Sequence, residues 1–404
     1  MPFVVFAAPR LSENAFGMVV AAATLPDVRL AVITHDGAEG LQHLQARVAH
    51  WQVENILDVE QLVGAGEGLS RLHGTIDRFF GAYEQLQGPL AEARARLGVE
   101  GMSAEAATNF RDKAQMKSLL RRAGLPCARH CLARTTAEAI AFASASGFPL
   151  VVKPPAGAGA IATFRVDNLA ALQGALQQTP PTAKTPVLLE EFVQGEEHSF
   201  ETVSIDGVHV WHSLTHYYPT PLTVIDNPWI QWSVVLPREV DAPQYDDIRT
   251  AARRALDVLG MRTGISHMEW FRRSDGTVAI SEVAARPPGA QITQLMSYAH
   301  DFDVVHEWAR AMIFGQFNVP ERKYAAGAAF LRGQGTGRIM AVHGVDEINR
   351  ELGSMIVAAK SPAIGATPSP SYEGDGWVII RHPQTEVVEA AITKIVATIR
   401  VELG

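Results

Sequence analysis

The sequence is poor in cysteine, has no long apolar run and carries no excess of basic residues. Its 404 residues include only Cys127 and Cys131, and neither a further cysteine nor a nearby histidine set completes a zinc pattern. We therefore expect reduced thiols in a cytoplasmic protein. No run of about 18 apolar residues is present, which argues against a membrane span. The N-terminus also lacks the basic region of a signal peptide.

Acidic residues outnumber basic ones, which limits the class of partner. The formal net charge is −8 and the pI is about 6.0, whereas binding to nucleic acid needs clustered lysine and arginine. With 47% hydrophobic and 19% charged residues, the chain is long enough for two or three domains with full apolar cores.

The N-terminal part shows the strand–helix–strand order of a parallel α/β unit. Apolar runs at 3–8 and 28–34 predict buried strands, and 14–24 between them predicts a helix. The glycine-rich stretch 64–68 lies outside the first strand-to-helix turn and is not spaced as G-x-G-x-x-G. We interpret it as a loop rather than as a nicotinamide or flavin site.

Two apolar runs flank Asp275-Gly276 and predict a β-hairpin in which these are the two turn residues. That register places Glu269 directly opposite Glu282 on one face of the sheet. Carboxylates in such a pair have Cβ atoms only about 5 Å apart and repel each other. A divalent cation such as Mg²⁺ between them would turn the repulsion into a binding site. The alternative is an exposed hairpin whose acids point into solvent.

Lys153 ends a predicted buried strand and precedes a loop that contains Gly157 and Gly159. Small residues let backbone N–H groups approach oxygen atoms, and the lysine supplies a positive charge, so the arrangement is typical of a phosphate site. An ordinary hairpin turn is the alternative. A helix predicted over 104–123 carries a second lysine of interest, Lys113.

A further predicted strand ends in Glu190 and Glu191 and continues into Phe192 and Val193. A linking segment of this kind has backbone groups free to bond the edge of an adenine, and Glu197 beyond it is placed to hold ribose hydroxyls. A solvated acidic turn is the alternative.

Taken together, the order and spacing of these elements resemble the ATP-grasp superfamily, and in particular its carboxylate–amine ligase branch, which includes L-amino acid ligases and carnosine-synthase-like enzymes. The elements are Asp112-Lys113, Val152-Lys153-Pro154 with its glycine loop, Glu190-Glu191-Phe192-Val193, Glu197, Glu269 and Glu282-x-x-x-Arg286. The resemblance covers nearly the whole chain. It implies an α/β and α+β architecture with an N-terminal Rossmann-like domain (1–103), a central ATP-grasp domain (104–325) and a small, separate C-terminal α+β subdomain (326–404).

The resemblance also implies a nucleotide site. Lys113, Lys153 and the glycine loop would contact the ATP phosphates, the segment 190–193 would hold the adenine, and Glu197 would bind the ribose. The loop has Ala160 where serine is common, so one hydroxyl contact to phosphate is missing.

By the same resemblance Glu269 and Glu282 are ligands of Mg²⁺, or of Mn²⁺ in its place, and Arg286 stabilises charge on the transferred phosphoryl group. Many members have asparagine two residues after the second glutamate as a further metal ligand, whereas this chain has Ala284 there. The hairpin register puts His267 opposite Ala284, so we predict that His267 or water takes the place of that ligand.

The implied activity is ATP-dependent ligation of a small-molecule carboxylate to an amine through an acyl phosphate, with amino acids or a short peptide as substrates. We expect a cytoplasmic homodimer that binds neither nucleic acid nor membrane, with substrate selectivity in the aromatic stretch 211–232 and in the loop after Arg286. Three alternatives remain: carboxylation through carboxyphosphate, an ATP-binding module without turnover, and a dehydrogenase, against which the glycine spacing argues.

Overall fold

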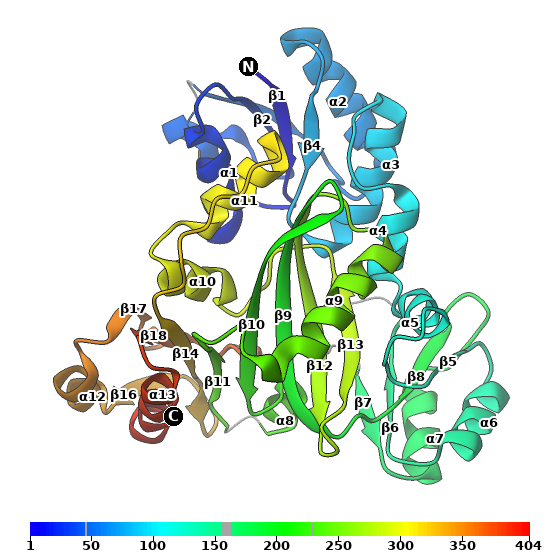
Figure 1. The fold of residues 1–404 in the computed structure, drawn as a ribbon, viewed down its shortest axis with the longest axis vertical. Helices are drawn as coiled ribbons and strands as arrows, with labels where there is room; N and C mark the ends of the chain where they lie inside the picture. The colour runs from blue at the N-terminus through cyan, green and yellow to red at the C-terminus, as the bar shows by residue number, and fades with distance from the viewer. Residues whose placement is uncertain (45–46, 156–162, 228–229) are drawn as a thin grey trace.

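The computed structural model of the chain describes residues 1–44, 47–155, 163–227 and 230–404, in which the strands form four β-sheets (Figure 1). None of the helices in these ranges is both long and apolar enough to cross a membrane. Cys127 and Cys131 are free thiols, as the sequence predicted.

The N-terminal unit is a parallel four-stranded sheet in the order β3-β2-β1-β4, with helices packed on it. All five residues of β1 are buried, as expected for a parallel strand covered on both faces. Its elements are β1 (Phe3–Ala7), α1 (Glu13–Thr24), β2 (Arg29–Thr34), η1 (Ala38–Leu44), β3 (Val48–Gln52), α2 (Val59–His73), β4 (Arg78–Phe80), η2 (Glu84–Leu86) and α3 (Gln87–Leu97).

The glycine-rich stretch 64–68, predicted as a loop, lies inside helix α2, so that prediction was wrong. At two of its glycines, the side chain of another element packs directly against the helix backbone. A Cβ on Gly66 would lie 2.5 Å from the Leu97 side chain, and one on Gly68 would lie 2.2 Å from the Trp51 ring. The glycines therefore serve the approach of neighbouring side chains and not a flexible turn.

The helix predicted over 104–123 is two helices, because Asp112 ends the first and caps the second. Its carboxylate accepts hydrogen bonds from the N–H groups of Ala114 and Gln115, both at 2.9 Å. A small antiparallel sheet of order β5-β8-β6-β7 follows. The elements of this region are α4 (Ala104–Arg111), α5 (Lys113–Arg122), β5 (His130–Ala133), α6 (Thr136–Ser146), β6 (Leu150–Lys153), β7 (Phe164–Val166), α7 (Leu169–Gln178) and β8 (Val187–Glu191).

The largest sheet has eight strands in the order β13-β12-β9-β10-β11-β14-β18-β17. Helix α9 covers one face of this sheet (Figure 1). Side chains alternate along β12, so Met268 packs with the apolar residues of α9 while Glu269 lines the cavity on the opposite face. Its elements and their connections are β9 (Gly195–Ile205), β10 (Val208–Tyr218), α8 (Pro221–Asp226), β11 (Trp232–Leu236), η3 (Pro243–Tyr245), α9 (Asp246–Leu259), β12 (Gly264–Arg273), β13 (Val278–Ala284), α10 (Ile292–His300), α11 (Val304–Phe314), β14 (Ala325–Leu331), β17 (Ile356–Lys360) and β18 (Gly376–His382).

The C-terminal segment was predicted to be a separate unit, but its strands belong to the large sheet. Strand β14 pairs with β11 and with β18, and β18 pairs with β17. The expected boundary between residues 325 and 326 falls within one continuous sheet. The other domain limits stay predictions. The remaining elements are β15 (Gly333–Gln334), β16 (Ile339–His343), α12 (Val345–Leu352), α13 (Thr385–Thr398) and β19 (Arg400–Leu403), of which β15, β19 and β16 form a three-stranded sheet.

The β12–β13 hairpin pairs Glu269 with Glu282 as predicted, but its turn is longer by one residue. The Arg273 N–H donates to Thr277 O at 2.9 Å, which leaves a three-residue loop whose last residue, Gly276, has φ +83°. A bulge at Ser281 then shifts the register back. The predicted pair is therefore correct although the predicted turn is not.

Candidate active site

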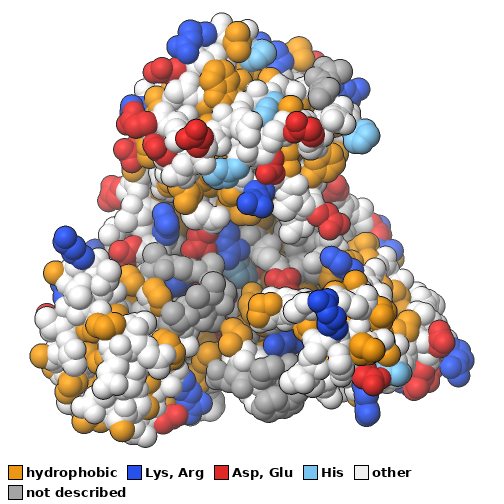
Figure 2. Space-filling view, turned by 180° about the vertical axis from the view of Figure 1, so that it is seen from behind, with side chains coloured by type: hydrophobic (Ala, Val, Ile, Leu, Met, Phe, Trp, Pro, Cys, Tyr) orange, Lys and Arg blue, Asp and Glu red, His pale blue; other side chains and the backbone are white. Residues whose placement is uncertain are grey.

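One cavity of about 240 Å³ lies between the small sheet, helix α5 and the β12–β13 hairpin. From behind, the lobes of the molecule surround a hollow in which acidic and basic side chains lie close together (Figure 2). The predicted glycines Gly157 and Gly159, with Ala160, lie outside the described residues. The cavity wall includes all the other predicted site residues: Lys113, Lys153, Glu190, Glu191, Phe192, Val193, Glu197, Glu269, Glu282 and Arg286.

The facing acids Glu269 and Glu282 are each held by a cation. Glu282 makes a close ion pair with Lys113, whose side chain is 7% exposed. Burial alone would raise the pKa of Glu269, but the neighbouring His267 and the charges of Lys113 and Arg286 lower that pKa to about 2. Glu269 is therefore a carboxylate where it meets the cavity.

His267 lies opposite Ala284 as predicted, but it is turned toward acids rather than left free. Its Nδ1 lies 2.9 Å from Glu201 Oε1, and its Nε2 lies 3.7 Å from Glu269 Oε1. Burial opposes protonation of this imidazole, yet its hydrogen bond to Glu201 and the neighbouring Glu269 carboxylate raise its pKa to about 9. In this arrangement His267 lies between the carboxylates of Glu201 and Glu269. That His267 or water replaces the missing metal ligand stays a prediction.

The donor set fits a magnesium ion that also contacts phosphate. Among the described residues, no group of three or more histidine, cysteine, aspartate or glutamate side chains is placed to enclose a metal. Two carboxylates from neighbouring strands, Glu269 and Glu282, do face one cavity. Mg²⁺ is usually held by one or two carboxylates together with water and substrate phosphates, so the protein would supply part of the coordination shell.

Glu190, in the wall of the cavity, lies between two lysines, of which only Lys153 also lines the cavity. Its carboxylate oxygens are 2.9 Å from Lys153 Nζ and 3.4 Å from Lys117 Nζ. Lys117 is fully buried and also donates to Ser281 O at 2.6 Å, the carbonyl of the hairpin bulge. Burial would raise the pKa of Glu190, but the two lysine charges lower it overall.

Sequence reasoning assigned no role to Lys117. A signal was available, because Lys113 and Lys117 are four residues apart on α5 and so share one face of that helix.

The predicted adenine segment has fewer free backbone groups than expected. The Glu191 N–H donates to Arg129 O at 2.9 Å and the Phe192 N–H donates to Pro149 O at 3.1 Å. Of the N–H groups of residues 191–193, that of Val193 is therefore the remaining candidate for an adenine contact.

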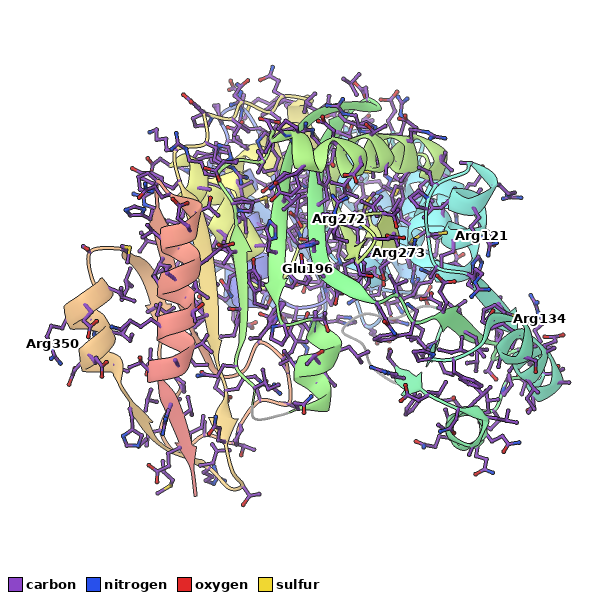
Figure 3. The ribbon with its side chains drawn as sticks, turned by 60° about the horizontal axis from the view of Figure 1, so that its bottom comes forward. Arg121, Arg134, Glu196, Arg272, Arg273 and Arg350 are labelled. Carbon is purple, nitrogen blue, oxygen red and sulfur yellow. The ribbon has the colours of Figure 1, made fainter. Side chains whose placement is uncertain are left out.

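Side-chain contacts also fix the position of Glu191. Its carboxylate accepts from Arg129 Nε at 2.6 Å and lies 3.3 Å from Arg273 Nη2, at the hairpin end that faces the small sheet (Figure 3). Two arginines therefore hold the Glu191 carboxylate in place.

Arg286 follows the end of β13 and faces an acid that sequence reasoning missed. Its Nε lies 3.3 Å from Glu84 Oε2, although the two residues are 202 positions apart. Glu84 begins the short helix η2 of the N-terminal unit. The pair therefore brings the N-terminal unit to the edge of the cavity.

The predicted aromatic stretch contributes only part of itself to the cavity. Tyr217 and Trp232 line it, with ring centroids 5.4 Å apart, and Tyr372 from the C-terminal segment packs on Trp232 at 4.8 Å. Trp211 instead packs against His300. The cavity thus has a charged end and an aromatic end.

Comparison with known proteins relates this geometry to a family. Residues 118–295 match the family model of the ATP-grasp domain. The chain is 25% identical over 209 residues to the L-arginine-specific L-amino acid ligase of Bacillus subtilis. This alignment covers 50% of this chain and 49% of that protein. It is 24% identical over 248 residues to an alanine–anticapsin ligase of Bacillus subtilis, across 56% of this chain and 52% of that protein. The chain spans about half the length of these curated relatives.

Solved structures share the fold over the full length. The L-amino acid ligase from Bacillus licheniformis superposes with a TM-score of 0.76 at 19% identity, covering 100% of this chain and 99% of that one. N5-carboxyaminoimidazole ribonucleotide synthetase from Thermotoga maritima gives 0.71 at 17% identity, covering 100% of both chains. Residues 118–295 are therefore similar to the ATP-grasp domain, and the chain shares the fold of these solved structures over its whole length, as the predicted fold class required.

Proposed function

We propose that this chain is an ATP-dependent carboxylate–amine ligase that joins two small molecules through an acyl phosphate and releases ADP and phosphate. The observation that carries the proposal is the convergence of Lys113, Lys153, Glu269, Glu282 and Arg286 on one cavity. The names of the curated relatives, an L-amino acid ligase and an alanine–anticapsin ligase, support amino acids as the substrates.

In this proposal the nucleotide lies between the small sheet and the hairpin. Lys153, whose side chain is 13% exposed, and Lys113 supply positive charge to the phosphates. Val193 offers its backbone to the adenine, and Glu197 accepts from the ribose hydroxyls. The Lys117–Glu190 ion pair keeps α5 and β8 in register beneath the nucleotide.

Mg²⁺ bound by Glu269 and Glu282 would neutralise charge on the β- and γ-phosphates. The two acids are held ready for this by cations on both sides. Lys113 pairs with Glu282, and His267 lies beside Glu269. A triphosphate would offer Lys113 a second anionic partner, so that Glu282 can turn from the lysine toward the metal.

The chemistry has two steps. A substrate carboxylate oxygen attacks the γ-phosphorus, the bond to the bridging oxygen of ADP breaks, and an acyl phosphate forms. A neutral amine then attacks the acyl carbon, inorganic phosphate leaves, and the amine loses a proton as the amide forms. The protein positions the reactants and stabilises developing charge, for which Arg286 is placed at the cavity wall.

The test is ADP formation from ATP and Mg²⁺ with pairs of amino acids, followed by mass spectrometry of the products. We expect ADP release that needs a carboxylate and an amine together, with a product whose mass equals the two substrates minus water. ADP release with bicarbonate and no amine would favour carboxylation instead. Tight ATP binding without phosphate release across the whole amino acid panel would contradict the proposal.

A further inference from the structure

Strand β13 is the outermost strand of the large sheet, and α5 with the segment after it covers its outer edge. The Ile280 N–H donates to Pro126 O at 2.8 Å. The Val283 N–H donates to Met116 Sδ at 3.2 Å. Backbone groups at the edge of a sheet need partners when they are buried. A helix and the loop that follows it supply those partners here.

The same helix also binds the bulge of this strand. Ser281 is the extra residue of β13, between Ile280 and Glu282, that has no partner on β12. Its carbonyl accepts a hydrogen bond from Lys117 Nζ at 2.6 Å. A hydrogen bond from a charged donor is stronger than one between neutral groups, so this contact is a firm one.

The bulge determines the face of the sheet to which Glu282 points. Trp270 pairs with Ile280 on the turn side of the bulge. If the pairing continued without a bulge, Glu282 would lie opposite Met268, which packs in the apolar layer. The extra residue instead brings Glu282 opposite Glu269, where both acids line the active-site cavity. The acidic pair therefore depends on the bulge.

Lys117 reaches the bulge from behind the cavity wall. Its side chain is 0% exposed, and it does not line the active-site cavity. Its second partner is Glu190, 3.4 Å away, which in turn lies 2.9 Å from Lys153 Nζ. One buried ammonium group thus contacts the bulge carbonyl and an acid of the small sheet.

We propose that Lys117 is a positioning residue of the metal site. By holding the Ser281 carbonyl it keeps the bulge, and so keeps Glu282 beside Glu269 as a pair that can bind Mg²⁺. The inference rests on the proposed ligase function and adds how its metal-binding geometry is maintained. Groups behind the ligands of a metal site orient those ligands, and losing one typically costs about 10- to 100-fold in metal affinity. Because Lys113 on the same helix pairs with Glu282 directly, α5 holds both the acid and its strand.

The first test measures metal binding without turnover. Mn²⁺ is titrated into the protein saturated with a non-hydrolysable ATP analogue, and free Mn²⁺ is measured by electron paramagnetic resonance. Lys117→Met removes the ammonium group, keeps an unbranched side chain and leaves Glu190 paired with Lys153. We expect its Kd for Mn²⁺ to rise by about tenfold or more. Lys184→Met, the same substitution at an exposed lysine, should leave this Kd unchanged.

The second test follows the bulge itself by hydrogen exchange, in protein without nucleotide or metal. In Lys117→Met the amides of Ile280 and Val283 should exchange about tenfold faster, because the strand loses a hydrogen bond from a charged donor. The amide of Ala329, in the interior strand β14, should respond less and serves as the reference. Glu190→Gln removes the other partner of Lys117, so it should speed exchange at Ile280 and Val283 no more than at Ala329.

The parent chain offers a third test, which decides the matter even if Lys117→Met does not fold. Coupling between two sites is reciprocal, so metal binding must stabilise the bulge if the bulge favours metal binding. Adding Mg²⁺ to the parent chain with the bound analogue should slow exchange at Ile280 and Val283 by about threefold or more. Exchange there that is unchanged by Mg²⁺ would overturn the proposal.

Two results with a folded Lys117→Met would also overturn it. One is an unchanged Kd for Mn²⁺, and the other is exchange at Ile280 and Val283 that only follows Ala329. The urea midpoint of each variant shows that it is folded. None of these measurements needs turnover, so a chain that forms no ADP would refute the ligase function while the role of Lys117 is still decided.

Discussion

Two lysine–glutamate clusters share the active-site cavity but differ in how closed they are. In Lys117–Glu190–Lys153 the side chains are 0%, 6% and 13% exposed, and each lysine is paired with the one acid. In the second, Lys113–Glu282 with Glu269, exposure rises from 7% at the lysine to 19% and 33% at the acids. The closed cluster holds elements together, whereas the open cluster has room to exchange its partners for a ligand.

The largest effect is expected from the open cluster. Glu282→Gln keeps the shape of the side chain but removes its charge, so we expect turnover to fall by about 10³-fold, or about 4 kcal/mol of transition-state stabilisation. The free energy of unfolding in urea should change less than in the closed cluster, because Glu269 still lies near Lys113. Steady-state ADP formation measures the loss, and Glu67→Gln on the exposed side of α2 is the control. Retained turnover in Glu282→Gln would remove that residue from the metal site.

The closed cluster should respond in the opposite way. Glu190→Gln leaves two buried lysines without an acid, and removing one partner of a buried ion pair costs about 3 kcal/mol or more. We expect the free energy of unfolding to fall by about that amount in urea titrations without ATP. If Glu190→Gln proved as stable as the parent chain, the cluster would not be holding α5, β6 and β8 together.

The sequence predicted the open cluster better than the closed one, for a physical reason. Glu269 and Glu282 flank a local turn, so their pairing follows from alternation along two adjacent strands. Even there, the longer turn shifts the strand register by one residue and the bulge at Ser281 shifts it back. No local sequence pattern indicated either feature. Glu190 and Lys117 meet through packing between elements, and Lys117 was visible only as the helical neighbour of Lys113.

Contacts between distant segments were beyond sequence reasoning. Glu84 reaches Arg286 from the N-terminal unit, and Glu201 holds His267 from a neighbouring strand. Both depend on how sheets and helices pack, which periodicity does not specify. The fold class was predicted correctly, because the order and spacing of the motifs along the chain indicate it. The interpretation of stretch 64–68 failed, because glycine permits close helix packing as well as turns.

The variant Arg286→Ala tests whether the positive charge beside the open cluster stabilises the transition state. Arg286→Ala should lower kcat by about 10²-fold while the KM for ATP changes by less than about threefold, because its charge is needed where negative charge develops. Glu84→Gln should leave Arg286 charged and lower kcat far less. Equal losses in kcat and in ATP affinity would assign Arg286 to binding.

Lys153 belongs to the closed cluster through its ion pair with Glu190, but it also lines the cavity. Its substitution therefore separates an effect on ATP binding from an effect on stability. Lys153→Ala should raise the KM for ATP by about tenfold, or about 1.4 kcal/mol, because an ATP phosphate loses its interaction with the Lys153 ammonium group. Lys117→Ala should instead lower the free energy of unfolding, because Lys117 is fully buried and does not line the cavity. Lys184→Ala, at an exposed lysine outside the cavity, should change neither quantity. If Lys153→Ala altered only stability, both lysines would belong to the framework, and Lys113 would be the lysine left to contact the phosphates.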